Sequence, residues 1–241
     1  MNVLDLFSGL GGWSAAFKDR GHSVTTLDID PKFKPDIVKD ILELKSIAEI
    51  GEFDIILASP PCEVFSIAAV WLHHWKKENG RYVPNDQRAV LAKRIAEHTF
   101  SLLGHSNAKF YVIENPRGFM RHVICMPKAE INWCKYVTDQ EKASLSKGFH
   151  DKRKPAYFKA TDLWGRLPPS FQAFKCKPGN PDHAYAGGHD AFHFATHRIR
   201  KDVGDASKRA LLPYGLSLAM CEAAERDLAC QPQPNSTMQS T

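Results

Sequence analysis

The sequence predicts an α/β fold in which helices cover both faces of a mostly parallel sheet. Three observations lead to this fold class. Strand and helix patterns alternate through the first 115 residues, which is typical of parallel sheets. The expected strands are apolar along their length, as strands buried on both faces are. Glycines, acidic residues and a cysteine follow the strand ends, and that edge of such sheets binds ligands.

The same patterns place each element in order. Strand patterns cover residues 2–7, 23–27, 53–58 and 109–115. Helix patterns cover residues 13–20, 41–50, 88–105 and 211–228. In the third helix the shared apolar face holds Leu91, Ile95 and Leu102, and in the fourth it holds Leu216, Met220 and Leu228.

Charge divides the chain unevenly. Residues 1–146 hold 18 basic and 18 acidic side chains, whereas residues 147–209 hold 13 basic and 6 acidic ones. This excess is typical either of a solvated basic face or of a lobe that binds a polyanion. We expect four parts: a cofactor-binding and catalytic core over 1–150, a small basic, loop-rich lobe over 151–208, a helix returning to the core over 209–229, and a disordered tail over 230–241.

Composition restricts the cell compartment and the ligands. There is no apolar run of the roughly 18 residues that a membrane span needs, and no signal-like leader. Six cysteines lack regular spacing, so we expect free thiols. The histidine-rich stretch 183–197 matches no common zinc-finger spacing, and we expect no metal site. These features predict a cytoplasmic protein without a membrane partner, and we expect a monomer.

The first strand end carries the glycine turn "DLFSGLGG", residues 5–12. Glycines let a backbone approach a ligand closely, and the helix that follows favours negative groups at its N-terminus. The spacing is neither that of a P-loop nor the full dinucleotide fingerprint, which argues against ATP and NAD. Asp28, at the end of the second strand, could accept ribose hydroxyls. Asp40 could lie by an adenine edge or be an exposed loop acid.

The third strand end carries "SPPCEVFS", residues 59–66. Buried cysteines are common, so Cys62 alone is as well explained by packing. The two prolines before it cannot extend a strand, however, and they place the thiol where the chain leaves the sheet. There, near helix N-termini, a thiol can ionise to the nucleophilic thiolate.

Together with "VIENPRG", residues 112–118, these two stretches resemble the DNA cytosine carbon-5 methyltransferases. The resemblance spans roughly residues 3–118, and the ordered trio of motifs is much more specific than any one of them. It implies the S-adenosylmethionine-dependent, Rossmann-like methyltransferase fold, the cofactor S-adenosyl-L-methionine, and DNA with a flipped cytosine as the partner. The compact length is similar to that of phage or mobile-element enzymes, which act in a bacterial or phage-infected cell.

The resemblance also implies roles for individual residues. The catalytic residues would be Cys62, Glu114, Asn115 and Arg153. The cofactor would contact Phe7, Ser8, Gly9, Leu10, Gly11, Gly12, Asp28, Ile29, Asp40, Ile41, Pro60 and, through a looser match at 212–220, Ser217. DNA would contact Ser66, Arg117, Arg198, Arg200 and Lys201.

The chemistry agrees with these roles. Carbon-5 of cytosine is too weak a nucleophile to take a methyl group directly, whereas addition of a thiolate at carbon-6 converts the ring into an enamine. Negative charge then develops on the ring, and a carboxyl at ring nitrogen-3 offsets it, which is the role implied for Glu114. A duplex hides the base, so the base must be flipped out or already single-stranded.

The sequence also departs from the family pattern. Ser59 replaces a usual glycine, Glu63 a usual glutamine, and Pro116 a usual aliphatic residue. The QxRxR element is absent as such, and Arg153 or the pair Arg198 and Arg200 are its nearest candidates. The long stretch between Glu63 and Gln87 is interpreted as a lid that closes over the flipped base, or as an ordinary surface insertion.

Other classes of function remain open. An exocyclic-amino DNA methyltransferase would carry an aromatic residue where Cys62 stands. A non-catalytic DNA-binding module would be expected to lose Cys62 or Glu114. An RNA cytosine methyltransferase, or transfer of a modified methyl group, would use the same residues.

Overall fold

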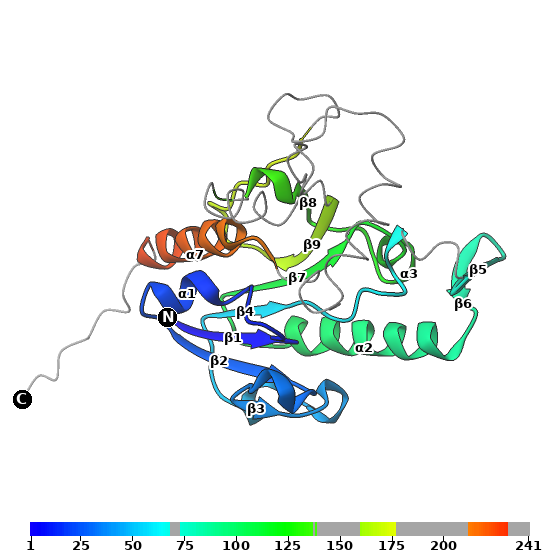
Figure 1. Cartoon of the computed structure of the whole chain (residues 1–241), viewed down its shortest axis with the longest axis horizontal. Coiled ribbons are helices and arrows are strands. Elements are labelled where there is room, and N and C mark those ends of the chain that lie inside the picture. Colours follow the sequence, from blue (N-terminus) through cyan, green and yellow to red (C-terminus); the bar gives the residue numbers. More distant parts are fainter. Residues whose placement is uncertain (68–72, 137, 139–159, 177–211, 231–241) are drawn as a thin grey trace, which may run out of the picture.

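A seven-stranded sheet organises the computed structural model of the chain (Figure 1). The structure describes residues 1–67, 73–136, 138, 160–176 and 212–230. The strand order is β3-β2-β1-β4-β7-β9-β8. In chain order the strands are β1 (Asn2–Leu6), β2 (Ser23–Asp28), β3 (Ile37–Val38), β4 (Ile55–Ala58), β7 (Phe110–Pro116), β8 (Ala129–Asn132) and β9 (Ala160–Arg166).

Five strands are parallel, and two antiparallel strands extend one side. β1 pairs with β2 and β4, β2 with β3, and β4 with β7, all in parallel. β9 then pairs antiparallel with β7, and β8 antiparallel with β9. The parallel sheet expected from the sequence is therefore confirmed. β8 and β9 were not expected, and β9 belongs to the sheet although it lies within the range assigned to the basic lobe.

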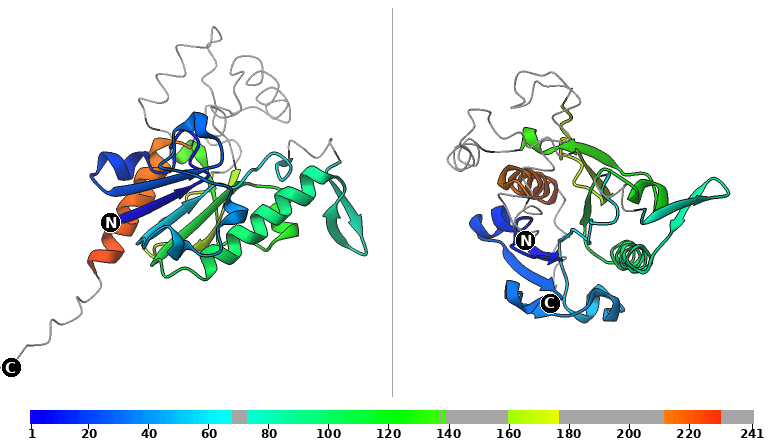
Figure 2. Two further views of the ribbon diagram at one scale, coloured as in Figure 1. Left: turned by 90° about the horizontal axis from the view of Figure 1, so that it is seen from below. Right: turned by 45° about the vertical axis from the view of Figure 1, so that its right-hand side comes forward.

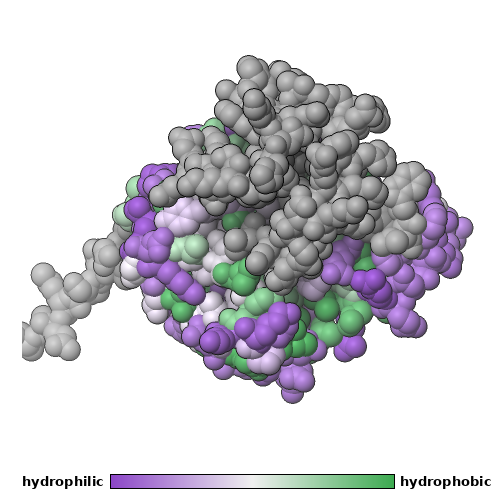
Figure 3. Space-filling model, in the orientation of Figure 1, coloured by the Kyte–Doolittle hydropathy of each residue, from purple (hydrophilic) through white to green (hydrophobic). Residues whose placement is uncertain are grey.

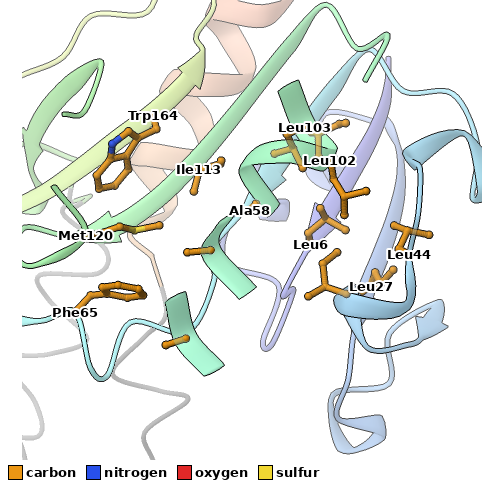
Figure 4. Packing of buried hydrophobic residues seen from close by; sticks show 14 of the residues in the cluster. Leu6, Leu27, Leu44, Ala58, Phe65, Leu102, Leu103, Ile113, Met120 and Trp164 are labelled. Atoms are coloured by element: carbon orange, nitrogen blue, oxygen red, sulfur yellow. The ribbon is translucent and has the colours of Figure 1, made fainter. Parts of the chain in front are cut away.

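Helices cover both faces of the sheet (Figure 2). One face packs against α2 (Gln87–Gly104), with Leu4, Leu6 and Ile113 in its core. Part of this core, with Phe65, Met120 and Trp164, is drawn in Figure 4. The other face packs against α1 (Ala15–Asp19) and α7 (Tyr214–Ala229). Because strand side chains alternate, β1 and β4 supply both cores at once.

Two expectations for helices were wrong. Residues 41–50 form two short 3-10 turns, η2 (Ile41–Glu43) and η3 (Ile47–Glu49), because Asp40 and Ser46 each cap a new turn while Leu44 between them is extended. In α2, Leu91 is half exposed. The helix packs instead through small side chains, which let it approach the sheet closely: Ala89, Ala92, Ala96 and Thr99.

The stretch between Glu63 and Gln87 is not an irregular loop where the structure describes it. It contains a two-stranded antiparallel hairpin, β5 (Trp75–Glu78) and β6 (Arg81–Pro84). Two short helical elements complete the fold, α3 (Met120–Val123) and the 3-10 turn η5 (Trp133–Lys135). A further 3-10 turn, η1 (Pro31–Phe33), follows β2.

Candidate active site

The glycine turn after β1 is held by β2. The backbone N–H of Ser8 donates to the Leu27 carbonyl at 3.1 Å, and that of Gly9 donates to the Asp28 carboxylate at 2.9 Å. Gly9 and Gly11 have φ values of +50° and +77°, which favour glycine. Phe7 also has a positive φ, +59°, an uncommon conformation for a residue with a side chain. The turn is therefore held in one conformation, and at its glycines no side chain covers the backbone.

A cavity of about 200 Å³ opens beside this turn, at the carboxyl edge of β1, β2 and β4. Its lining includes five residues expected from the sequence: Phe7, Ser8, Gly9, Leu10 and Gly12. It also includes five that sequence reasoning missed: Asp5, Trp13, Phe33, Ser59 and Leu212. Phe33 had no local signal, because its place depends on how η1 folds back, whereas Leu212 begins the 212–220 stretch, from which only Ser217 was selected.

The remaining residues expected at the cofactor do not line this cavity. Gly11 lies in the turn itself, where its N–H donates to the Ser8 carbonyl. Asp28 ends β2 and is buried, and its carboxylate accepts from the N–H groups of Gly9 and Asp30, whereas Ile29 beside it is 63 % exposed. Asp40 caps η2, while the side chains of Ile41 and Pro60 are buried.

Ser217 supports the cavity from behind instead of lining it. Its hydroxyl donates to the Trp13 carbonyl at 2.5 Å and accepts from the Ala16 N–H at 3.1 Å. Ser14, the residue at the N-cap of α1, does not cap the helix, because its hydroxyl donates to Asp5 at 2.6 Å. A serine on α7 thus completes the first turn of α1, an end that would otherwise leave orphan N–H groups.

Asp5 is a buried acid in the wall of the cavity. Burial raises the pKa of Asp5 to about 7, although the hydrogen bond from Ser14 and the charge of Lys18 lower it. The group therefore changes charge near neutral pH, directly behind the glycine turn.

The loop over residues 59–66, which we call the nucleophile loop after the role expected for Cys62, follows β4. Cys62 is partly exposed, and its carbonyl accepts from the N–H groups of Phe65 and Ser66 at 3.1 and 3.0 Å. These bonds turn the chain sharply after the thiol. Because Pro60 and Pro61 precede it, the loop leaves the sheet at β4 and does not extend the ladder.

Four contacts join this loop to the end of β7 and to the segment after it. Ser59 Oγ donates to Glu114 Oε2 at 3.0 Å, and Asn115 Nδ2 donates to the Pro60 carbonyl at 3.0 Å. Further along, the Phe119 N–H donates to the Phe65 carbonyl at 2.8 Å, and Ser66 forms an isolated bridge with Gly118. Cys62 and Glu114 are thereby held on two strand ends that cannot move independently.

Gly118 makes the last of these contacts possible. A Cβ at this position would lie 2.0 Å from the Phe65 carbonyl oxygen, and no side chain fits there. The glycine of "ENPRG" therefore serves the approach of the nucleophile loop.

The acid after the nucleophile has a partner. Glu63 Oε2 lies 2.6 Å from Arg88 Nη2, at the start of α2, and both side chains are exposed. Arg88 thus compensates the negative charge of Glu63, at a position where the family usually has a neutral glutamine.

Beyond β7, an ion-pair network joins α3 to β9 and β8. Arg121, in α3, makes a bidentate contact with Asp162 in β9, and the Asp162 carboxylate is fully buried. Arg121 also contacts Glu130 at 3.1 Å. Arg117, expected to contact DNA, is half exposed and lies 3.1 Å from Glu130. Arg153, Arg198, Arg200 and Lys201 lie outside the described residues, as does the histidine-rich stretch 183–197.

One group of side chains in the described part of the chain has the spacing of metal ligands: His22, Cys221 and Glu225. The Glu225 carboxylate already accepts from Arg20 at 3.0 and 2.7 Å, and it lies 2.8 Å from His22 Nε2. A guanidinium on the same carboxylate disfavours a second cation. The group joins α7 to the end of α1.

The sequence that builds this site matches a family model. Residues 1–122 match the model of C-5 cytosine-specific DNA methylases. The chain belongs to this family. The family depends on S-adenosylmethionine and has an α/β methyltransferase fold with a mostly parallel sheet. Both expectations are confirmed.

Curated relatives of this chain are similar over about half of its length. A type II methyltransferase of Haemophilus parahaemolyticus is 27 % identical over 147 residues, which cover 54 % of this chain and 36 % of the relative. A type II methyltransferase of Bacillus sp. is 22 % identical over 127 residues, covering 47 % and 40 %. A probable DNA (cytosine-5)-methyltransferase of Frog virus 3 is 28 % identical, covering 56 % and 64 %. The chain thus spans less than two thirds of the length of each.

Among solved structures, a putative DNA modification methyltransferase encoded within an E. coli prophage is 18 % identical. The similarity covers 69 % of this chain and 46 % of that one, with a TM-score of 0.42. Within the described part of the chain, no helix is long and apolar enough to cross a membrane.

Proposed function

We propose that this protein transfers a methyl group from S-adenosylmethionine to carbon-5 of a flipped cytosine in DNA, through a covalent adduct with Cys62. The observation that carries the proposal is the four-contact junction between the loops of Cys62 and Glu114, which opens beside the glycine-turn cavity. We infer that the enzyme acts as a monomer in the cytoplasm, where the DNA of a bacterium or an infecting phage lies.

The residues around the cavity suit the cofactor. Glycines with positive φ keep side chains away from one wall, while Trp13, Phe33 and Leu212 supply apolar surface. Asp28 offers a carboxylate at the end of β2, the position where such sheets hold ribose hydroxyls. When bound, S-adenosylmethionine supplies the methyl group on a sulfonium centre.

The chain's own residues then perform the steps on the base. The Cys62 thiolate attacks carbon-6, and a new C–S bond forms as the ring's 5,6 double bond opens. Glu114 holds a proton at ring nitrogen-3 and so offsets the negative charge that the addition places on the ring. Carbon-5 takes the methyl group, loses its proton to a base, and the restored double bond expels the thiolate.

Neighbouring residues position the two reacting groups. Asn115 fixes the carbonyl of Pro60 and hence the start of the nucleophile loop. Ser59 fixes one oxygen of Glu114. Reactions of this kind gain most from such preorganisation, because a displacement of about 1 Å can cost about 100-fold in rate.

A covalent trap tests the mechanism. With S-adenosylmethionine present, DNA containing 5-fluorocytosine should form a stable adduct with the wild-type protein, because carbon-5 then has no proton to lose. Cys62→Ala should form no adduct and should lose methyl transfer by at least about 10³-fold. Cys125→Ala is the matched control, since Cys125 is an exposed free thiol outside the junction. Cytosine methylation by Cys62→Ala at the wild-type rate would disprove the proposal.

The substrate is tested by mapping methylated cytosines. DNA and RNA from cells that express the protein are sequenced after conversion of unmethylated cytosine, with cells expressing Cys62→Ala as the blank. Methylcytosine in a short DNA sequence context is expected. If methylcytosine appeared only in RNA, methyl transfer to carbon-5 of cytosine would stand, but DNA as the substrate would be wrong.

A further inference from the structure

The hairpin β5–β6 projects from the sheet beyond the nucleophile loop (Figure 1). We propose that this hairpin, Trp75–Pro84, is a preformed arm that binds a groove of duplex DNA beside the target base. The inference rests on the proposed function, because it assigns a second contact surface to the same DNA. We call the hairpin the basic arm.

The root of the arm is part of the nucleophile loop's packing. Trp75 is 8 % exposed and lies nearly parallel to the ring of Phe65, with centroids 5.4 Å apart, and to that of Phe119, at 6.3 Å. Its indole N–H donates to the Val64 carbonyl at 2.6 Å. Val64 is two residues from Cys62. Whatever holds the arm therefore also fixes the position of the nucleophile loop.

The two ends of the arm are joined to each other and to the N-cap of α2. His74 Nδ1 donates to Asp86 Oδ2 at 2.5 Å, and the Asn85 N–H donates to the His74 carbonyl at 2.8 Å. The other oxygen of Asp86 accepts from the Ala89 N–H and so caps α2. On the opposite strand, the Tyr82 ring meets the Phe119 ring edge-on at 5.0 Å.

These contacts make the arm rigid before any ligand arrives. An isolated two-stranded hairpin is marginally stable in water, but this one is closed by a buried tryptophan and a buried histidine. A preformed surface loses little conformational entropy on binding. The arm therefore needs little further ordering when it binds DNA.

The outer part of the arm carries charge. Lys76, Lys77, Glu78 and Arg81 are all exposed, and their charges sum to +2. Hydrophilic residues gather over β5 and β6 at the right-hand rim of Figure 3. Residues 1–146 as a whole hold equal numbers of basic and acidic side chains, so the excess on the arm is local.

Shape points to a duplex groove. A two-stranded β-ribbon fits the major groove of B-DNA, which is about 12 Å wide, and β-ribbons are known DNA-reading elements. Lys77 shares a face with the packed residues Trp75 and Tyr82, whereas Lys76 and Arg81 point to the other face, by the alternation of strand side chains. A ribbon with cations on both faces can contact the phosphates on both walls of a groove.

The salt dependence of DNA binding tests the arm. The triple variant Lys76→Ala/Lys77→Ala/Arg81→Ala is compared with Lys45→Ala/Arg94→Ala/Lys109→Ala, which removes the same charges from exposed sites elsewhere. The probe is a fluorescein-labelled duplex of mixed sequence, titrated at several salt concentrations. Removal of one phosphate contact should reduce the slope of log K against log salt by about 0.9, so the slope for the arm variant should be smaller by about 2 to 3.

The outcomes separate the arm from the proposed function. A reduced slope for the arm variant, with a wild-type slope for the control, supports the arm. Equal slopes in all three proteins, or no duplex binding by the wild type, overturn it. Methyl transfer is measured on the same proteins: transfer with equal slopes leaves the function standing without the arm, and a reduced slope without transfer leaves the arm standing without the function. The single variant Lys77→Ala should move the slope in the same direction, by less.

Discussion

Ser59 belongs to both parts of the site, the cavity beside the glycine turn and the junction that holds Glu114. It lines the cavity beside the glycine turn, and its hydroxyl donates to Glu114. The hydroxyl is a departure from the glycine usual in the family pattern, and a glycine could not make this hydrogen bond. The side chain therefore positions one carboxylate oxygen of Glu114 from the wall of the cavity.

Replacing Ser59 with Ala should lower kcat by about 3- to 10-fold, because the positioning of Glu114 then lacks one hydrogen bond of about 0.5–1.5 kcal/mol. The KM for S-adenosylmethionine should change less than kcat. Ser59→Thr keeps the hydroxyl and should restore most of the rate. The measurement is steady-state methyl transfer to DNA.

Ser8→Ala is the control for this variant. Ser8 also lines the cavity, so its replacement tests the wall without touching Glu114. If Ser59→Ala raised the cofactor KM and left kcat unchanged, as a change in the wall alone would, the positioning role would be wrong.

Single residues were predictable from the sequence where the motif itself fixes their place. Cys62 and Glu114 follow apolar strands in a recognisable order, so their meeting at one sheet edge could be expected. The pairs Ser59–Glu114 and Asp5–Ser14 could not, because each depends on the rotation of neighbouring strand ends. Phe33 was missed because nothing in a short 3-10 turn indicates which side chain folds over the glycine turn.

The loop after Cys62 and the segment after β7 work as one element. Gly118 lets them touch, and a methyl group there would overlap the Phe65 carbonyl oxygen. Overpacking of this kind typically costs about 1–3 kcal/mol. Because Phe65 is three residues from Cys62, relief of the overlap must displace the nucleophile loop.

Gly118→Ala should therefore lower both the free energy of unfolding, by about 1–3 kcal/mol, and the rate of methyl transfer. Urea unfolding and steady-state kinetics measure the two effects. Gly104→Ala is the matched control. No atom lies within 4 Å of a Cβ built at Gly104, and alanine in a helix is favoured over glycine by up to about 1 kcal/mol. Wild-type stability and rate in Gly118→Ala would contradict the close approach.

At the level of strands and helices, burial periodicity predicted the parallel half and failed elsewhere for definite reasons. β8 and β9 are antiparallel additions that come after the strand–helix alternation of the first 115 residues, so that alternation does not predict them. The 41–50 segment has helical spacing of Ile41, Leu44 and Ile47, but its polar caps divide it. The hairpin was obscured by its basic residues, which are typical of exposed loops as much as of a projecting ribbon.

The first and last helices are joined into one unit. Arg20 and His22, at the end of α1 and after it, both contact Glu225 on α7. These contacts, led by the hydrogen bond from Arg20, hold the pKa of Glu225 below its ordinary value. Gly215, also in α7, lets this helix approach the end of η5 closely, since a Cβ there would lie 2.2 Å from the Tyr136 carbonyl oxygen.

Glu225→Gln should lower the free energy of unfolding at pH 7 by about 0.5–1 kcal/mol, a value reduced for the partial exposure of the pair. A carboxylate whose folded pKa is lowered stabilises the fold above its unfolded pKa. That stabilisation is lost as pH falls through the lowered value. Wild type and variant should therefore converge in stability once the pH lies below that lowered pKa.

Glu222→Gln provides the comparison, because Glu222 lies 4.0 Å from Arg20 and is 43 % exposed. It should change stability by less than about 0.3 kcal/mol. Equal effects of the two substitutions in urea unfolding at pH 7 would show that the Glu225 contacts have no special weight.

The hydrogen bonds from Ser217 to the start of α1 also imply an order in time. Ala16 and Ser217 are 201 residues apart, and at about 5–20 residues per second a ribosome needs on the order of 10 to 40 seconds to pass from one to the other. During that interval the nascent chain already carries all three motifs, but the carbonyl of Trp13 and the N–H of Ala16 still lack their partner. The start of α1 therefore gains these hydrogen bonds only after the three motifs have been synthesised, when α7 docks against it.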